Sequence, residues 1–512
     1  MNTYLLLLPI LLPILGGACL PAFRFKNRKH RQAYVGSIVC INTVLLFWMM
    51  ITGIEGVCTP LQLSDMLELK FHMDGFSKVF AGLVALLWPM ATLYAFEYMK
   101  HEGRENLFFS FYTMTYGVTV GITFAGNLIT LYMFYELLTL STLTLVMHSL
   151  DKKSILAGRK YMVYSIAGAA FAFMGLMFLL FYGTTTDFVF GGVLDISKVG
   201  ANTNLLLFAF VMTALGFGVK AAIFPFHGWL PTASVAPTPV TALLHAVAVV
   251  KAGAFAIMRI TYYSFGMDFL QGSWGQYTVM TFAIVTIVFG SSMAVKETHL
   301  KRRLAYSTVS NLSYIVLGTM MISPAGFVGG MSHMIMHGIM KITLFFCVGA
   351  IMHQTHKEYI KDIGGIAKSM PVVMACFTVG SIAVVGVPPL CGFVSKWYLA
   401  TAAFKEGSGF AMAGAIALLI SAFLTAIYLF SIVIKAYFET PLVEKIVCEE
   451  LDECAGHQEI AATYEGVKTF KKQDPNWYMK APLIVLCMIM AVLGLCSGPL
   501  IHFFEQIAQG LL

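Results

Sequence analysis

The chain has 512 residues, of which 58% are hydrophobic and 12% charged, and its mean hydropathy is +0.78. Soluble domains carry about 25% charged residues, so this composition excludes a soluble globular protein and indicates a polytopic membrane protein. The formal net charge of +7 does not indicate nucleic-acid binding, because the basic residues stand in short segments between apolar runs.

Apolar runs of about 20 residues, the length that crosses a bilayer as a helix, occur fourteen times along the chain. The predicted fold class is therefore an all-α integral membrane protein with a single polytopic domain over residues 1–512. The first run lacks a preceding basic segment and is long enough to span, so we expect a helix there rather than a signal peptide. The predicted helices begin near residues 4, 32, 76, 107, 127, 161, 204, 238, 275, 304, 325, 371, 410 and 481.

Three strongly basic segments follow the first, fifth and ninth predicted helices: RFKNRKHR, DKKSILAGRK (151–160) and KETHLKRR (296–303). With fourteen helices all three lie on one side of the membrane, and loops rich in Lys and Arg are typical of the cytoplasmic side. We therefore expect a multi-pass protein of the cell (plasma) membrane, a prokaryotic inner membrane, with both termini on the outer side.

The one sizeable soluble insertion is predicted at about 436–480, as a cytoplasmic loop before the last helix. We interpret it as a solvated loop, and a docking element is the alternative. Its charged residues are Glu444, Glu449, Glu450, Asp452, Glu453, Lys468, Lys471 and Lys472.

The sequence shows no recognisable route to a bound cofactor. The ten cysteines are scattered without a CxxC pair, and neither a GxGxxG nor a Walker sequence occurs. We therefore expect no cofactor, no metal ion and no catalytic residue in this chain.

The segment GFGVKAAIFPFHGWLPTASVAPTP predicts a broken seventh helix that carries a buried lysine. Pro225 follows Lys220 by five residues, and proline breaks a helix because it lacks the backbone donor. Irregular backbone survives in a membrane only inside protein or beside water, so Lys220 is predicted to lie in a hydrated pocket. The alternative is a lysine at a helix end whose side chain reaches the interface.

The segment VGVPPLCGFVSKWYLA predicts a second break, in the twelfth helix. Here the break at Pro388 and Pro389 precedes the charge of Lys396, whereas in the seventh helix the charge comes first. Because these two predicted helices run in opposite directions, the two arrangements are related as inverted repeats. Broken helices at corresponding places in two halves indicate an ion site in transporters.

The segment HMIMHGIMK places His333, His337 and Lys341 at successive four-residue steps, which stack along one face of a helix. Histidine titrates near neutral pH, so this stripe is predicted to be a proton relay. One alternative is a histidine that only completes the packing. A zinc site is the other, although the glutamate of HExxH is missing and Lys341 would repel a cation.

Glu136 stands in the middle of the fifth predicted helix, where a carboxylate needs a counter-charge, and Lys220 is the predicted partner. A carboxylate within ~4–6 Å keeps a lysine protonated, so separation of the pair would release the proton. His245 and Lys251 place another histidine and lysine in the eighth helix. Arg259, near the outer end of that helix, is expected to be an interface anchor.

Several motifs in this order resemble one family: the antiporter-like membrane subunits of respiratory complex I, shared with multisubunit cation/proton antiporters and membrane-bound hydrogenases. The resemblance covers about residues 70–435. It rests on FYELLTLSTLTLV, GVKAAIFPFHGWLPTASVAPTPVTALLHAVAVVKAGAFAIMR, LKRRLAYSTVSNLSYI, HMIMHGIMKITLFFCVGAI, DIGGIAKSMP and GVPPLCGFVSKW. It implies two inverted five-helix repeats, at about 107–262 and 275–435, with broken helices 7 and 12. The proton-transfer residues that it implies are Glu136, Lys220, His245, Lys251, His333, His337, Lys341 and Lys396.

The chain departs from the family at His299, Asn311 and Ser313, where Asp, Gln and Gly are frequent. We expect these departures to affect the cytoplasmic start of a helix and not the proton path.

The resemblance implies a proton-translocating antiporter-like membrane subunit of a multisubunit redox-driven complex, either a membrane-bound hydrogenase or a complex I-like NADH dehydrogenase. The chain itself would be the ion-translocating subunit of that oxidoreductase or translocase. Expected partners are other membrane subunits, including related antiporter-like subunits, the lipid bilayer and H⁺, with Na⁺ left open; no nucleic acid is expected. One alternative is a subunit of a multisubunit Na⁺(cation)/H⁺ antiporter without a redox partner, and another is an inactive scaffold.

Overall fold

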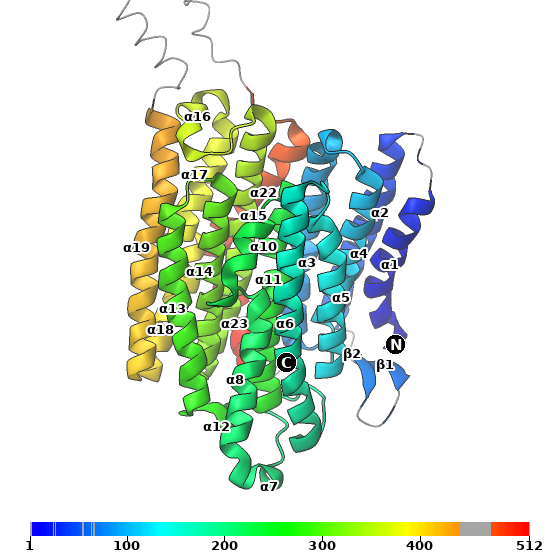
Figure 1. Ribbon diagram of the computed structural model, residues 1–512, viewed down its shortest axis with the longest axis vertical. Helices are drawn as coiled ribbons and strands as arrows, with labels where there is room; N and C mark the ends of the chain where they lie inside the picture. Colours follow the sequence, from blue (N-terminus) through cyan, green and yellow to red (C-terminus); the bar gives the residue numbers. More distant parts are fainter. Residues whose placement is uncertain are drawn as a thin grey trace, which may run out of the picture.

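Long helices lie side by side along one direction and form nearly all of the described chain (Figure 1). The computed structural model describes residues 3–439 and 473–510, except residues 24, 26, 54, 55, 63, 65 and 66. The predicted loop at 436–480 therefore lies mostly outside the described residues, as do all eight of its named charged residues.

The elements follow the order of the apolar runs. The first part of the chain contains η1 (Thr3–Leu7), α1 (Leu8–Cys19), η2 (Leu20–Ala22), α2 (Arg28–Thr52), β1 (Val57–Gln62), β2 (Glu68–His72), α3 (Gly75–Tyr98), η3 (Met99–His101), α4 (Glu105–Thr123), α5 (Leu128–Val146), α6 (Lys152–Tyr182), α7 (Ile196–Val199) and η4 (Gly200–Asn202). The middle part contains α8 (Thr203–Lys220), η5 (Phe226–Gly228), α9 (Trp229–Ala233), α10 (Thr238–Ala246), α11 (Val249–Arg259), the π-helix η6 (Ile260–Phe265) and α12 (Met267–Leu270). The last part contains α13 (Trp274–Lys296), α14 (Leu300–Met320), α15 (Pro324–Thr355), η7 (Ile360–Asp362), α16 (Ile366–Ser369), α17 (Pro371–Val385), α18 (Cys391–Glu406), α19 (Gly409–Phe438), α22 (Trp477–Leu495) and α23 (Gly498–Ala508).

Helix starts coincide with capping residues in the sequence. The side chains of Asp74, Asn127, Ser273 and Ser408 each accept a hydrogen bond from a backbone N–H in the first turn of the helix that follows. Such caps satisfy donors that have no partner inside the helix, so they fix where each helix begins. Most predicted starts agree with the structure to within four residues.

The largest error in a predicted start concerns α6, which begins at Lys152 and not near residue 161. Asp151 caps it by accepting a hydrogen bond from the backbone N–H of Ser154. The first turns of α6 carry Lys152, Lys153 and Arg159, so an apolar window cannot detect them even though they are helical.

Eleven helices of the described chain are long and apolar enough to cross a membrane, and the protein is therefore a multi-span membrane protein. The fold class is confirmed as all-α apart from the β1–β2 hairpin, which was not predicted. Helices α4 and α14 run through the same bundle, as do α17 and α18 (Figure 1). The count of fourteen spans and the repeat symmetry stay predictions.

Two transmembrane segments lie at the centre of the bundle. The most apolar windows within 238–265, which holds α10, α11 and η6, and within α15 are completely buried, whereas only 28% of the window in α22 is buried. Both central segments carry basic residues. The fold therefore buries lysine and histidine side chains in protein and keeps them away from the peripheral surface.

Candidate functional site

The predicted proton-transfer residues fall into two groups by burial. Glu136 and Lys396 are only partly buried. The residues with no exposed surface are Lys220, His245, Lys251, His333, His337 and Lys341.

Glu136 and Lys220 form the predicted ion pair. The Lys220 ammonium lies 3.7 Å from Glu136 Oε1, and it also donates a hydrogen bond to the backbone carbonyl of Tyr135. The same ammonium lies 3.3 Å from the centroid of the Tyr135 ring. The pair is asymmetric, because the lysine is fully buried and the Glu136 side chain is 29% exposed.

The backbone breaks immediately after Lys220, as the sequence predicted. Ala222 adopts a left-handed conformation with φ of +57°. The indole N–H of Trp229, the first residue of α9, donates to the carbonyl of Val219 over 2.7 Å, so this carbonyl near the end of α8 has a side-chain partner. Lys220 thus occupies the last residue of α8.

A second break, which was not predicted, separates α10 from α11. Val247 and Ala248 leave helical geometry between His245, at the end of α10, and Lys251, in the first turn of α11. The run of β-branched valines here is a weak signal for reduced helix propensity. Because of this break, His245 and Lys251 lie on two different helices, α10 and α11.

Lys251 meets the histidine stripe of α15. Its Nζ lies 2.8 Å from His337 Nδ1. The rings of His333 and His337 stack with centroids 5.4 Å apart, and His333 Nδ1 lies 3.0 Å from the hydroxyl of Ser395 on α18. The structure therefore brings α11, α15 and α18 together through this stripe.

Lys341 has a different set of partners. Its ammonium donates to the hydroxyl of Ser307 on α14 over 2.5 Å, and that hydroxyl also bonds to the phenol of Tyr428. Asn311 donates to the carbonyl of Ser307 over 2.8 Å and is buried. The expectation that Asn311 and Ser313 lie at a helix start is wrong, because both are buried in the middle of α14; His299 does precede the start of that helix.

Lys396 lies after the predicted break in the twelfth helix. Its ammonium donates to the carbonyls of Val384 and Val385 at the end of α17, each over 2.8 Å. It also lies 5.7 Å from the ring of Tyr314, which in turn packs 5.0 Å from the His333 ring. Tyr314 therefore connects Lys396 with the histidine stripe.

His245 is the least connected member of the site. Its ring packs 4.6 Å from the ring of Phe345, and neither ring nitrogen has a hydrogen-bond partner in the described chain. Among the described residues no hydrogen bond joins His245 to Lys220 or to Lys251.

Several buried polar atoms of the site, those of His245 included, lack a hydrogen-bond partner within the part of the chain that the structure describes. Buried polar atoms are normally hydrogen-bonded, and leaving one unpaired costs about 1–3 kcal/mol, so water is the partner that fits here. The atoms are Glu136 Oε1, His245 Nδ1 and Nε2, His333 Nε2, His337 Nε2, Asn311 Oδ1 and Ser313 Oγ.

Arg259 is not an interface anchor. It is 1% exposed and forms a two-pronged ion pair with Asp74, with N–O distances of 2.5 and 2.7 Å. Its guanidinium also contacts the rings of Phe255 and Tyr263. Asp74 is 185 residues away in the sequence, so no local pattern could have revealed the pair.

A family model described as "NADH:quinone oxidoreductase/Mrp antiporter, TM" matches residues 125–425, which is more than half of the chain. The chain belongs to this family. The region matched includes every predicted proton-transfer residue. The resemblance seen in the sequence is thereby confirmed.

Two curated relatives illustrate the range of the family. NADH-quinone oxidoreductase subunit N of Desulforudis audaxviator is 30% identical over 441 residues, which cover 83% of this chain and 82% of the relative. An Na(+)/H(+) antiporter subunit of Alkalihalophilus pseudofirmus is 31% identical over 444 residues, which cover 81% of this chain but 54% of the relative. This antiporter-like chain thus spans about half the length of the second relative.

Solved structures share the fold at low sequence identity. The Mrp complex from Dietzia sp. contains a chain with a TM-score of 0.83 at 20% identity, covering 100% of this chain and 98% of that one. Respiratory complex I from Thermus thermophilus gives 0.78 at 20%, with 99% and 98% covered. An archaeal membrane-bound sulfane sulfur reductase gives 0.81 at 21%, with 99% and 97% covered. The relatives are thus subunits of multisubunit membrane complexes.

Proposed function

We propose that the chain translocates protons as the antiporter-like membrane subunit of a multisubunit, redox-driven complex. A buried basic residue in a membrane is costly, from ~3 kcal/mol upwards, so a connected group of them is retained for a function. The observation that carries the proposal is the chain of contacts from the buried Lys251 through His337, His333 and Tyr314 to the partly buried Lys396.

The proposed cycle begins at the ion pair between Glu136 and Lys220. Glu136 is partly exposed on the side of the bundle, where a neighbouring subunit can change its surroundings. Separation of the two charges removes the carboxylate that keeps Lys220 protonated. The proton then crosses to Lys251 through water beside His245, since no direct hydrogen bond spans this gap in the described chain.

From Lys251 the proton passes to the stripe formed by His337 and His333, which Lys341 extends by one helical turn. Lys396 is the proposed exit to the outer side. The proposed orientation in the cell membrane places the basic segments on the cytoplasmic side and both termini on the outer side. Transfer of one charge against the membrane potential costs ~2.3 kcal/mol per 100 mV, so a partner must supply the energy.

Electron transfer in an attached module is the proposed energy source, in either a membrane-bound hydrogenase or a complex I-like NADH dehydrogenase. The second candidate is a cation/proton antiporter subunit without a redox partner, which the similarity to the Na(+)/H(+) antiporter of Alkalihalophilus pseudofirmus favours. Affinity purification of the tagged chain separates the two. Co-purifying quinone or hydrogenase subunits and proton uptake driven by an electron donor support the first, whereas proton movement driven only by a cation gradient supports the second.

The relay itself is tested by Lys220→Ala and Lys396→Ala in the intact complex, reconstituted in sealed vesicles. Loss of a proton-transfer group is expected to lower the rate of proton transport by about tenfold or more. Lys198→Ala is the matched control, because Lys198 pairs with Asp195 in a half-exposed position outside the site. Unchanged transport in both variants, with the complex assembled, would falsify the relay.

A further inference from the structure

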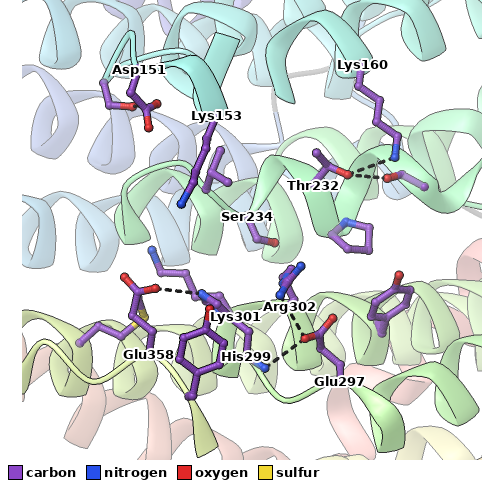
Figure 2. A pocket seen from close by; sticks show the side chains of 17 residues that line it. Asp151, Lys153, Lys160, Thr232, Ser234, Glu297, His299, Lys301, Arg302 and Glu358 are labelled. Atoms are coloured by element: carbon purple, nitrogen blue, oxygen red, sulfur yellow. Dashed lines mark hydrogen bonds and ion pairs between the residues drawn. The ribbon is translucent and has the colours of Figure 1, made fainter. Parts of the chain in front are cut away.

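A polar cavity of about 590 Å³ opens between the start of α6, the segment 228–235 and the start of α14 (Figure 2). Its volume lies in the range of about 300–1,000 Å³ that is typical of small-ligand sites. The cavity does not include any of the proposed proton-transfer residues. It joins elements that belong to the two predicted repeats.

Lysines face this cavity from two sides. Figure 2 shows Lys153 and Lys160 on one side and Lys301 with Arg302 on the other. Of these, Lys153, Lys160 and Lys301 take part in no ion pair within the described part of the chain. The cavity is therefore lined by three ammonium groups that form no ion pair with a carboxylate among the described residues.

Of the three lysines, Lys301 gives the strongest argument that the cavity holds an anion, because it is buried. It is 5% exposed, and its ammonium donates a hydrogen bond to the carbonyl of Ala236 over 3.2 Å. A carbonyl does not neutralise the charge, and a buried cation without a counter-charge is destabilising. Lys160 similarly donates to the neutral hydroxyl of Thr232, over 3.2 Å. Both ammonium groups have donors left for an anion.

The three carboxylates that line the cavity already have other partners. Glu297 lies 3.4 Å from Arg302 and accepts from the backbone N–H of His299. Glu358 lies 3.4 Å from the imidazole of His299. Asp151 caps α6.

We propose that this cavity binds a phosphate-bearing anion, held by the ammonium groups of Lys160 and Lys301. Lysine binds phosphate as a point charge, and each ammonium can donate up to three hydrogen bonds. The source is either the headgroup of an acidic phospholipid or free phosphate, since basic pockets at the cytoplasmic side of transmembrane helices bind anionic headgroups. The bound anion ties α6 and α9 to α14.

The test uses the whole complex, delipidated and placed in three environments: phosphatidylcholine nanodiscs alone, the same with phosphatidylglycerol, and the same with inorganic phosphate added. Retained phospholipid is counted by native mass spectrometry, and the melting temperature Tm is recorded. We expect phosphatidylglycerol or phosphate to raise Tm. Lys160→Gln and Lys301→Met are each expected to weaken that effect, with binding about tenfold weaker per lysine.

Lys152→Gln is the matched control, because Lys152 neighbours Lys153 but does not line the cavity. Lys301→Arg keeps the charge and should retain binding, which distinguishes a lost anion from a misfolded protein. A response to phosphatidylglycerol alone identifies the headgroup, and a response to phosphate alone identifies a soluble anion. A Tm that neither probe raises, or equal responses in Lys160→Gln, Lys301→Met and the wild type, would overturn the proposal.

Discussion

The hydrogen bond between Lys251 and His337 is the contact at which a proton can change residue inside the bundle. Each of the two nitrogens can act as donor or as acceptor, depending on which holds the proton. If Lys251 donates, a neutral His337 carries its own proton on Nε2, an atom with no partner in the described chain. The next acceptor along the stripe is the stacked ring of His333.

Replacement of both His333 and His337 by Ala is expected to slow proton transport by about tenfold or more, because it removes both titratable rings between Lys251 and Lys396. Transport in sealed vesicles is the measurement. His353→Ala, on the same helix but outside the site, should leave the rate unchanged. Normal rates in the double variant would leave the two histidines with a packing role only.

The buried ion pair between Asp74 and Arg259 supports a second prediction for single residues. Arg259→Met leaves the Asp74 carboxylate buried without a counter-charge, which is expected to cost about 3–5 kcal/mol of stability. Thermal unfolding of the complex measures the loss. The double variant Asp74→Leu with Arg259→Met removes both charges and should recover part of the stability. A single variant as stable as the wild type would contradict this account.

Close packing between α11 and the end of α8 fixes the position of Lys251. A Cβ added at Gly253 would lie 2.6 Å from the backbone nitrogen of Ala221 and 2.9 Å from the carbonyl oxygen of Phe217. Backbone atoms cannot move aside cheaply, so only glycine allows α11 to approach the end of α8 here. This contact holds Lys251 and Lys220 in neighbouring helices at a fixed separation.

Gly253→Ala is therefore expected to push α11 away from α8 and to reduce both Tm and proton transport. Gly36→Ala on α2 is the matched control, since its added Cβ would meet only ordinary contacts at 3.7 Å. An alanine in a helix interior gains up to about 1 kcal/mol over glycine, so the control should be neutral or slightly more stable. Equal behaviour of the two variants would show that the close approach is unimportant.

At the scale of the whole molecule, the two ends of the polar path reach the side of the bundle. Glu136 on α5 is flanked by Met133, which is 50% exposed, and Lys396 on α18 is flanked by Trp397, which is 57% exposed. A partly exposed charge facing lipid is costly. Because the relatives are subunits of multisubunit membrane complexes, neighbouring subunits are the expected cover for both ends.

A photoreactive amino acid in place of Met133 or Trp397 is accordingly expected to cross-link to another subunit of the intact complex. Mass spectrometry of the products identifies the partner. The same residue in place of Phe181, which is 70% exposed on α6, provides the comparison on a helix that carries neither charge. Lipid adducts alone at Met133 and Trp397 would contradict the proposed subunit contacts.

The sequence by itself determined the membrane class, most helix starts and the breaks at Pro225 and at Pro388, because hydropathy and the missing proline donor act locally. It also indicated that Glu136 pairs with Lys220. These inferences need only short-range chemistry or the resemblance to the family.

Only the tertiary structure decided the contacts between distant segments. The partner of Arg259 and the hydroxyl that binds Lys341 both depend on packing between different helices. The valine-rich break before Lys251 carries too weak a local signal to be predicted. Burial and close approach are properties of the assembled bundle, and a linear pattern does not specify which buried groups meet.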